Sequence, residues 1–433
     1  MLSLWKDTVE RTFPVRRLDG DAEVDVLVVG GGLAGILCAY KLKQAGVNCA
    51  VVEGGRVGGG TTGNTTAKIT AQHGLVYHQI IHKYGIDAAR RYYEAHAQAV
   101  EDYEKLAALF SCDFERKTAY TYSLSDRKKL EDEATAYEKL GIKPVFLDSP
   151  PLPFTVAGAI GMENQAQFHP LKLLYALARE LTVYEETFVR ELRGADAITN
   201  RGTIRAKNIV LATHFPLVNI PGLYFLKLYQ HRSYVIALEN AKDVDGMFVD
   251  EQEKGFSFRN HGNLLLLGGG DHRTGKTGGG WAELRRLAGQ AYPGAKERYA
   301  WAAQDCMSLD AAPYIGVHRK SAPHLYVATG FSKWGMTGAM AAANVLRDLI
   351  ALGSSEHEAV FSPSRSMLHP QLFANAFSAS VNLVTPGKRC THMGCCLKWN
   401  ADERSWDCPC HGSRFDERGG VLENPATRGI KVK

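Results

Sequence analysis

The last 44 residues of the chain contain side chains whose types and spacing suit metal binding. Five of the nine cysteines lie there, in the order C-T-H at 390–392, C-C at 395–396 and C-P-C-H at 408–411. Two thiolates and two neutral imidazoles can bind one tetrahedral zinc ion or the two irons of a cluster. Zinc sites more often show paired cysteines at short spacing, so this pattern favours an iron–sulfur centre.

The segments CTHMGC and CPCHGS resemble the two cluster-binding loops of Rieske [2Fe–2S] proteins. The resemblance implies that two thiolates bind one iron and two imidazoles the other. The implied ligands are Cys390, His392, Cys408 and His411, and the implied loop-to-loop disulfide joins Cys395 and Cys410. Cys396 is predicted to be a packed thiol without a role. So short a segment cannot bury a core of its own, and we expect it to dock on the flavin domain or to depend on its metal.

A second chemical motif lies near the N-terminus. The apolar run VDVLVV at 24–29 precedes Gly30, Gly32 and Gly35, which have the G-x-G-x-x-G spacing, and an amphipathic stretch follows. This order predicts a strand, a tight turn and a helix whose N-terminus binds a pyrophosphate. Glu53 follows Gly30 by 23 positions, at the end of a second predicted strand, where a carboxylate accepts hydrogen bonds from ribose hydroxyls. The sequence therefore predicts a dinucleotide site in a βαβ unit.

The segments around this site resemble the D-amino-acid oxidase superfamily of FAD enzymes, over about residues 24–352. The matching segments are GGRVGGGTTGNTTAKITAQHG after Glu53, ETFVREL, VLATHFP and GFSKWGMTGAMAAANVLRDLI. The motif and the resemblance together imply the following FAD-binding residues: Gly30, Gly32, Leu33, Ala34, Gly35, Glu53, Arg56, Thr61, Thr62, Gly63, Thr66, Ala67, Val189, Thr213, Gly330, Trp334, Gly335, Met336 and Thr337.

The resemblance also directs attention to a substrate site. Amino-acid-oxidising members carry an arginine eight residues before a PxIG-like turn, and Asp305 stands at that place here. If it faces the substrate, a carboxylate favours an amine over an amino acid; the alternative is a structural ion pair. Lys333 and Trp334 fall beside the flavin in the same comparison, and His231, Arg232 and Tyr234 lie on a strand expected to wall the substrate domain. The implied catalytic candidates are Asp305, Lys333, Trp334, His231 and Tyr234. The other glycine cluster, LLLLGGGDHRTG, lacks the spacing for a second nucleotide, which implies reduction by an organic substrate, and His272 and Arg273 in it are predicted to lie at the surface.

These motifs require an α/β chain with a Rossmann-type FAD domain, an α+β substrate domain inserted into it, and a small Rieske-like segment. The expected domains are an N-terminal arm at 1–23, an FAD domain at 24–95, 155–218 and 310–358, a substrate domain at 96–154 and 219–309, a linker at 359–381 and the cluster segment at 382–433. Further strands are expected at 206–212, 233–238, 263–267 and 325–328, and a strand pair near KTAYTYSL.

Composition limits the possible partners. The chain is 45% hydrophobic, has a net charge of +5 without basic blocks, and contains no run of about 20 apolar residues. These features predict a cytoplasmic protein without a membrane span or a nucleic-acid partner. The expected partners are an amine or amino-acid substrate and an external one-electron acceptor, which could be a protein.

Several functions remain open at this stage. The first is a dehydrogenase that passes electrons from FAD through the cluster; the others are an oxidase with an auxiliary cluster and a redox sensor or electron carrier without turnover. His73, His78 and His82 lie close together in sequence, which raises the alternative of a Rieske oxygenase, but such enzymes need a carboxylate as well, and position 70 is a threonine. His78 and His82 are therefore predicted to share one face of a surface helix.

Overall fold

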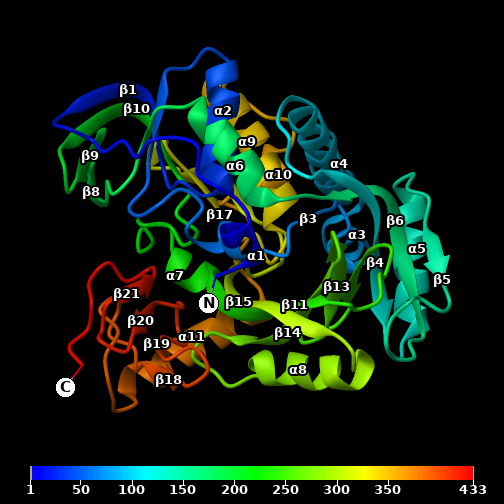
Figure 1. The fold of residues 1–433 in the computed structure, drawn as a ribbon. Helices are drawn as coiled ribbons and strands as arrows, with labels where there is room; N and C mark the ends of the chain where they lie inside the picture. Colours follow the sequence, from blue (N-terminus) through cyan, green and yellow to red (C-terminus); the bar gives the residue numbers. More distant parts are fainter. Residues whose placement is uncertain (1, 433) are drawn as a thin grey trace.

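The computed structural model describes residues 2–432, which form two large sheets with covering helices and a small C-terminal domain (Figure 1). The first sheet has the order β16-β17-β10-β1-β2-β7. Its strands are β1 (Ala22–Val29), β2 (Cys49–Val52), β7 (Val183–Tyr184), β8 (Val189–Arg193), β9 (Asp196–Thr199), β10 (Thr203–Leu211), β16 (Tyr314–Arg319) and β17 (Ala322–Thr329).

Strand β1 is central in this sheet and pairs in parallel with both β2 and β10. Its last four residues are buried, as expected for a parallel sheet that is covered on both faces. Helix α2 (Leu33–Gln44) connects β1 to β2, which confirms the predicted βαβ unit. Strand β16 is antiparallel to β17 at one edge of the sheet, and β9 is antiparallel to both β8 and β10.

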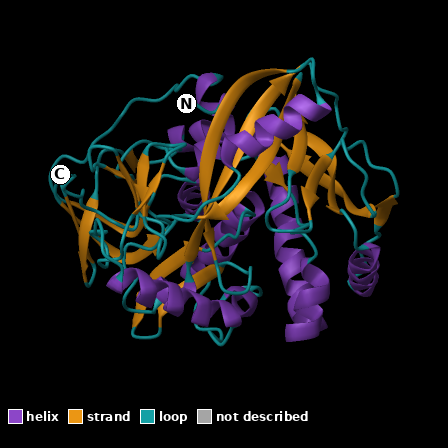
Figure 2. Cartoon of the chain, turned by 90° about the horizontal axis from the view of Figure 1, so that it is seen from below, coloured by secondary structure: helices purple, strands orange, loops and turns teal. Residues whose placement is uncertain are grey.

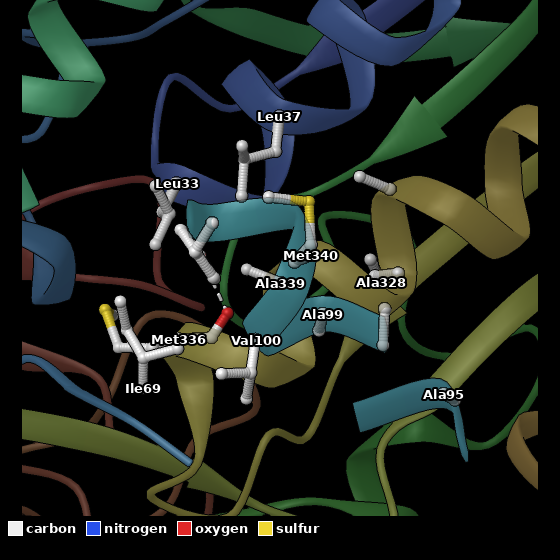
Figure 3. Close-up of a cluster of buried hydrophobic side chains, with 14 of the residues drawn as sticks. Leu33, Leu37, Ile69, Ala95, Ala99, Val100, Ala328, Met336, Ala339 and Met340 are labelled. Carbon is white, nitrogen blue, oxygen red and sulfur yellow. Dashed lines mark hydrogen bonds between the residues drawn. The ribbon is translucent and has the colours of Figure 1, made fainter. Parts of the chain in front are cut away.

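Three helices form the main core next to this sheet: α2, α4 (Ile86–Leu109) and α9 (Gly335–Ala351). Figure 3 shows Leu33 and Leu37 of α2 meeting Met336 and Met340 of α9, with Val100 of α4 nearby. Four alanines make much of the buried face of α9 small, at positions 339 and 341–343. Small side chains allow the helix axes to approach closely, which fixes the start of α9 relative to the start of α2.

The second sheet has the order β15-β11-β14-β13-β12-β4-β6-β3. Its strands are β3 (Lys68–Ile69), β4 (Glu115–Ser123), β5 (Val145–Leu147), β6 (Gly158–Gln167), β11 (Tyr229–Glu239), β12 (Met247–Asp250), β13 (Ser257–His261), β14 (Leu264–Arg273) and β15 (Lys296–Met307). Helix α8 (Gly280–Ala291) packs on β14 and β11, and Figure 2 shows the long curved strands from below. The other helices are α1 (Leu4–Asp7), η1 (Thr61–Asn64), α3 (Val76–Tyr84), α5 (Arg127–Lys139), α6 (Pro170–Arg179), α7 (Tyr224–Lys227), α10 (Glu358–Phe361) and α11 (Pro370–Val384).

The structure differs from the sequence-based expectation at three places. The region near KTAYTYSL is one strand, β4, between β6 and β12, instead of a strand pair. Strands β3 and β6 lie in the second sheet, whereas the sequence predicts their residues to be part of the FAD domain. The segment expected to be a linker contains helix α11, whose 15 residues carry no charge and only one buried side chain, Asn375.

The C-terminal domain is a sheet of four short strands that rests on the rest of the chain (Figure 1). The expected docking on the flavin domain is only part of this contact, because β11 and β15 of the second sheet also hold the domain. Its strands are β18 (Lys398–Asn400), β19 (Ser405–Asp407), β20 (Arg414–Asp416) and β21 (Val421–Glu423). Neutral hydrogen bonds join it to both large sheets. Gln304 of β15 donates to the Gly412 carbonyl at 2.9 Å, and Asn424 donates to the Thr213 carbonyl at 2.6 Å.

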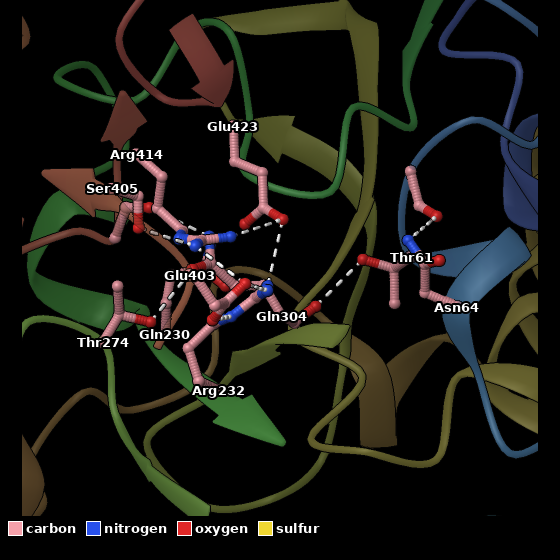
Figure 4. A network of polar contacts seen from close by, with 12 residues as sticks. Thr61, Asn64, Gln230, Arg232, Thr274, Gln304, Glu403, Ser405, Arg414 and Glu423 are labelled. Atoms are coloured by element: carbon pink, nitrogen blue, oxygen red, sulfur yellow. Dashed lines mark hydrogen bonds and ion pairs between the residues drawn. The ribbon is translucent and has the colours of Figure 1, made fainter. Parts of the chain in front are cut away.

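A buried network of charges completes this interface (Figure 4). Arg232 on β11, whose side chain is 3% exposed, pairs with Glu403 and, at 3.0 Å, with Glu423 of the C-terminal domain. Arg414 pairs with Glu403 at 2.9 Å and with Asp407 at 3.0 Å. Arg232 and Arg414 thus share the carboxylates of Glu403 and Glu423, so the C-terminal domain docks on β11 in one defined position.

Within residues 2–432, no helix combines the length and the apolar sequence needed to cross a lipid bilayer.

We predict that Arg232→Met loosens the C-terminal domain. The change leaves Glu403, whose side chain is 11% exposed, and Glu423, which is 31% exposed, with one guanidinium fewer. Removing one partner of a fully buried ion pair costs about 3 to 5 kcal/mol, and we expect a smaller loss here because water reaches Glu423. Thermal unfolding should show a new, earlier transition, and limited proteolysis should release the C-terminal domain first. Arg205→Met removes an exposed pair with Asp196 and should leave both readouts unchanged. Equal stability of the Arg232 variant and the wild type would contradict the role of the network.

Acid should loosen the same interface. Burial alone would raise the pKa of Glu403, but the charges of Arg232 and Arg414 outweigh it and lower the pKa from 4.5 to about 2. Because the folded-state pKa is lowered, this stabilisation is complete above about pH 4.5 and is lost as the pH falls towards 2. Proteolytic release of the domain should therefore increase over that range. Glu403→Gln should remove this part of the acid dependence, and an unchanged pH profile in that variant would argue against it.

Candidate functional site

The turn between β1 and α2 leaves room for a pyrophosphate at one glycine. A Cβ atom on Gly35 would lie 1.9 Å from the Gly30 carbonyl oxygen, and one on Gly30 would lie 2.4 Å from that of Ala212. These two glycines are therefore required by the packing of the turn. A Cβ atom on Gly32 would meet only Thr62 Oγ1, at 3.5 Å, so the space there is open on the side where the helix N-terminus presents its N–H groups.

Glu53 lies beside this turn, at the end of β2. Its carboxylate accepts hydrogen bonds from the N–H groups of Gly31 and Gly55, both at 2.7 Å. Burial raises the pKa of Glu53, and the two N–H groups act against that rise. An acceptor held here by the backbone fits the ribose of a dinucleotide.

The segment implied to cradle the flavin links the two large sheets. Thr62 Oγ1 accepts a hydrogen bond from the Leu33 N–H at 3.0 Å, and Thr61 Oγ1 donates to the Gln304 carbonyl at 2.9 Å (Figure 4). Ala67 has a positive φ of 55°, and Arg259 donates to its carbonyl at 2.7 Å. Gly63 lies within η1, and Thr66 lies near Lys68. The implied flavin-binding residues from Thr61 to Ala67 therefore lie along one continuous segment.

The other implied FAD contacts surround the same turn. Arg56 pairs with Glu186 at 2.9 Å, and the ring of Phe188, just before Val189, packs against Gly54. Thr213 directly follows β10, and Met336 and Thr337 begin α9. The turn at 330–335 includes Ser332 and Lys333, both with positive φ, and Trp334, whose ring stacks on His73 at 4.8 Å between centroids.

The candidate substrate residues divide into two groups on opposite faces of β11. Asp305 lies opposite His231 and accepts a hydrogen bond from Ser233 at 3.1 Å. The Lys333 side chain is near enough to Asp305 to act on its pKa, which burial raises and the Lys333 charge opposes. These side chains therefore lie together. Tyr234 does not join them, because its hydroxyl donates to Glu403 of the C-terminal domain at 3.1 Å.

Cysteine and histidine side chains of the C-terminal domain converge on one place. The sulfur atoms of Cys395, Cys408 and Cys410 lie within 4.8 Å of one another. The thiols of Cys390 and Cys408 are in hydrogen-bond contact. Both Cys395 and Cys410 carry free thiols in this structure, so their disulfide stays a prediction.

The two histidines of this group are arranged as a pair of ligands. The ring centroids of His392 and His411 lie 5.0 Å apart, and within the described residues the buried Nδ1 atom of each ring has no hydrogen-bond partner. Burial lowers the pKa of His392 to about 4 and that of His411 to about 3, which keeps the imidazoles neutral. Two unpartnered imidazole nitrogens suit the histidine ligands of a Rieske cluster, whereas the close sulfur group of Cys395, Cys408 and Cys410 includes only one of the two implied thiolates, so the ligand set stays a prediction.

The histidine side of the cluster site faces the body of the protein. His392 Nε2 is 3.1 Å from Asn219 Oδ1, and the ring of Phe215 lies 6.1 Å from both histidine rings. Arg273 donates to the Pro409 carbonyl at 3.2 Å. The prediction that His272 and Arg273 lie at the surface is therefore wrong, because the C-terminal domain covers this end of β14.

The oxygenase alternative finds no support in the positions of its histidines. His73 is buried and bonds to the Tyr92 hydroxyl at 2.6 Å, whereas His78 and His82 lie on the exposed side of α3. The three rings therefore do not form one metal site in this part of the structure.

We predict that Gly32→Val removes FAD without unfolding the chain. The valine side chain fits against Thr62 but occupies the space of the pyrophosphate. Flavin absorbance of the purified protein should be lost while circular dichroism is kept. Gly35→Val is the contrasting variant, since its side chain collides with backbone and should prevent folding. A Gly32 variant with full flavin content would show that the pyrophosphate lies elsewhere.

Comparison with known sequences supports both parts of the chain. Residues 25–349 match the family described as FAD dependent oxidoreductase, and residues 375–432 match the Rieske [2Fe-2S] domain. The putative Rieske 2Fe-2S iron-sulfur protein YhfW of Bacillus subtilis (strain 168) is 32% identical, over 99% of this chain and 96% of that protein. A cytochrome b6-f complex iron-sulfur subunit 2 of Trichormus variabilis is 49% identical over 43 residues, which are 10% of this chain and 24% of that subunit.

Solved structures share the fold of the larger part. L-proline dehydrogenase from P. horikoshii has a TM-score of 0.68 at 18% identity, covering 80% of this chain and 98% of that one. Glycine oxidase from Geobacillus kaustophilus has a TM-score of 0.67 at 19% identity, covering 80% and 100%. The match to the Rieske domain favours an iron–sulfur cluster over the alternative of a zinc site. The chain belongs to the FAD dependent oxidoreductase family and carries a C-terminal Rieske [2Fe–2S] domain.

Proposed function

We propose that the protein is a dehydrogenase that oxidises an amine or amino-acid substrate and delivers the electrons one at a time to an external acceptor. The substrate carbon that bears the nitrogen would lose a hydride and the nitrogen a proton, giving an imine. FAD, when bound, supplies a two-electron acceptor, and the cluster supplies a one-electron carrier. Two acceptor molecules are then reduced for each substrate oxidised.

One observation carries this proposal: the cluster histidines rest on the segment that leaves the FAD domain. Residues 213–219 continue directly from β10, next to the turn at Gly30, and Phe215 and Asn219 of this segment contact the rings of His392 and His411. A cluster used only for structure needs no such contact. A carrier of electrons from flavin does, because transfer between centres requires a short path through protein.

Residues of this chain would bind and orient FAD and would shield the cluster from water. Glu53 and the open space at Gly32 hold and orient the nucleotide, and the turn at 330–335 brings the N-terminus of α9 to its other end. The buried Cys390, Cys408 and His411 keep the cluster site away from water. Asn219 fixes the ring of His392.

The proposed substrate class rests on the solved structures that share the fold and not on any single residue of this chain. Among the solved structures that share the fold are ones named glycine oxidase and L-amino acid deaminase. An oxidase that returns electrons to oxygen, and a carrier without turnover, are separated from the proposal by the experiments below. The cytoplasmic location stays a prediction.

The first experiment is an anaerobic screen of amines and amino acids for bleaching of the flavin absorbance, with electron paramagnetic resonance of the same samples. We expect a bleaching substrate that also gives the signal of a reduced [2Fe–2S] cluster. A substrate that bleaches the flavin while the cluster stays oxidised would favour an oxidase with an auxiliary cluster. If no compound bleaches the flavin, the carrier function is preferred.

We predict that Cys408→Ser separates the two half-reactions. Loss of a thiolate ligand should abolish the cluster signal, while stopped-flow bleaching of the flavin by that substrate should keep close to the wild-type rate. Turnover with cytochrome c as the acceptor should fall to background. Cys396→Ser is the matched control, because this buried thiol donates to the Pro386 carbonyl and is not an implied ligand. Retained turnover in the Cys408 variant would contradict the proposed electron path.

A further inference from the structure

Of the two implied cluster loops, one reaches the surface of the molecule and the other does not. All six residues of the loop at 408–413 are buried, and a Cβ atom on Gly275 would lie 2.6 Å from the backbone nitrogen of Pro409, so the body of the protein covers this loop closely. In the loop at 390–395, Thr391 is exposed and residues 392–394 are half-buried. Since the body also covers the histidine side, an acceptor from solution can come nearest to the cluster site at residues 391–394.

The C-terminal end of α11 lies beside this exposed loop. The Cys396 N–H donates to the Asn382 carbonyl of the helix at 2.8 Å. Arg389 donates to the carbonyl of Leu383 at 2.8 Å and to that of Gly394 at 3.1 Å, and thereby joins the helix to the loop. The surface of α11 therefore continues directly into that of residues 391–394.

Helix α11 exposes an apolar stripe that leads towards this loop. The stripe consists of Phe373, Phe377, Val381 and Val384, whose intervals of four, four and three residues place them on one face of the helix. All four side chains are exposed, that of Phe377 to 72% and that of Val384 to 81%. Asn375 is the one buried side chain of the helix, so the stripe faces away from the body. A continuous apolar surface of this kind marks a contact site for another molecule.

The charge around this face is positive. Residues 366–401 include three lysine or arginine residues and no aspartate or glutamate. The Arg389 guanidinium donates to backbone carbonyls, so within residues 2–432 its charge has no carboxylate partner. Arg428 is exposed and lies at the loop as well, since its carbonyl accepts a hydrogen bond from the Thr391 hydroxyl at 2.5 Å. An apolar centre with a cationic edge suits a partner whose own contact surface is apolar and edged with carboxylates.

We infer that the acceptor of the proposed reaction is an acidic electron-carrier protein that docks on residues 391–394 and on the apolar stripe of α11. The inference rests on the proposed function and names the kind of partner. One electron passes from the reduced cluster to the acceptor, so the cluster is oxidised and the acceptor's own centre is reduced by one electron. A small contact suffices, because transient electron-transfer complexes bury less than about 1,200 Å². The position beside the exposed cluster loop favours an electron acceptor over a lipid surface or a second copy of this chain.

The test starts from chemically reduced holoprotein and therefore needs no substrate. Protein reduced with dithionite and freed of excess reductant is mixed in an anaerobic stopped-flow instrument with ferricytochrome b5, an acidic haem protein, or with ferricytochrome c, a basic one. We expect the second-order rate constant with cytochrome b5 to fall as salt is added, because salt screens an attraction, and that with cytochrome c to rise.

A charge reversal tests whether the attraction is local. Arg428→Glu should lower the rate constant with cytochrome b5 by about threefold or more at low salt. Lys143→Glu changes the net charge equally, at an exposed residue just before β5, a strand that lies at the opposite end of the molecule from the C-terminal domain (Figure 1). This control should keep the rate constant close to the wild-type value.

Phe377→Ser tests the apolar stripe. Loss of the ring should lower the rate constant with cytochrome b5 by about threefold or more, because an apolar side chain is no longer buried in the complex. Ferricyanide is too small to need the stripe, and an unchanged rate of its reduction will show that the cluster site is intact. Leu109→Ser, which alters an exposed apolar residue at the end of α4, is the matched control and should behave like the wild type.

An unchanged rate constant with cytochrome b5 in the Arg428 variant or in the Phe377 variant would overturn the inference. So would a wild-type dimer that Phe377→Ser dissociates in sedimentation velocity, or binding of the wild type to phosphatidylglycerol vesicles that the same variant abolishes, because the stripe would then belong to another partner. None of these results touches the proposed function, which is judged by flavin bleaching and cluster reduction with an oxidisable substrate. Conversely, these rates stay measurable if no oxidisable substrate is found.

Discussion

The ion pairs between Arg232 and the carboxylates of the C-terminal domain are the interaction on which the arrangement of the two redox sites depends. Arg232 is nearly fully buried on β11, and it holds Glu403 and Glu423, which Arg414 holds from the other side. Burying these charges costs free energy unless each has its partners, so the network is stable in only one position of the C-terminal domain on β11. That geometry brings His392 and His411 to Phe215 and Asn219.

The strand that carries Arg232 serves both functional regions at once. Side chains alternate across a strand, so Arg232 and Tyr234 face the C-terminal domain whereas His231 and Ser233 face Asp305. A one-residue shift of β11 would exchange these faces and destroy both sites together. The proposed substrate region and the cluster domain are therefore positioned by the register of a single strand between β14 and β15.

Local motifs predicted the two cofactors well, because each motif consists of residues close together in sequence. Residues 25–349 match the FAD family and residues 375–432 the Rieske domain, and the turn at Gly30 to Gly35 has the close backbone approach that its glycines permit. Contacts between distant segments were not predictable in this way. Arg273 was expected at the surface, and its partner, the Pro409 carbonyl, is 136 positions away along the chain. Strand β3 has only two residues, too few for a pattern that could assign it to the second sheet.

The small size of the C-terminal domain explains why the cluster cannot be treated as a separate module in this chain. Each strand of its sheet has three residues, and four of the seven buried side chains in its core are cysteines. Such a core gains little from burying apolar surface, so its stability must come from the bound metal and from contacts with β11, β15 and residues 213–219. The same contacts hold the histidines against the FAD domain. The contacts that stabilise the domain therefore also fix the separation between the two cofactor sites, so the proposed electron transfer depends on docking even when every cluster ligand is intact.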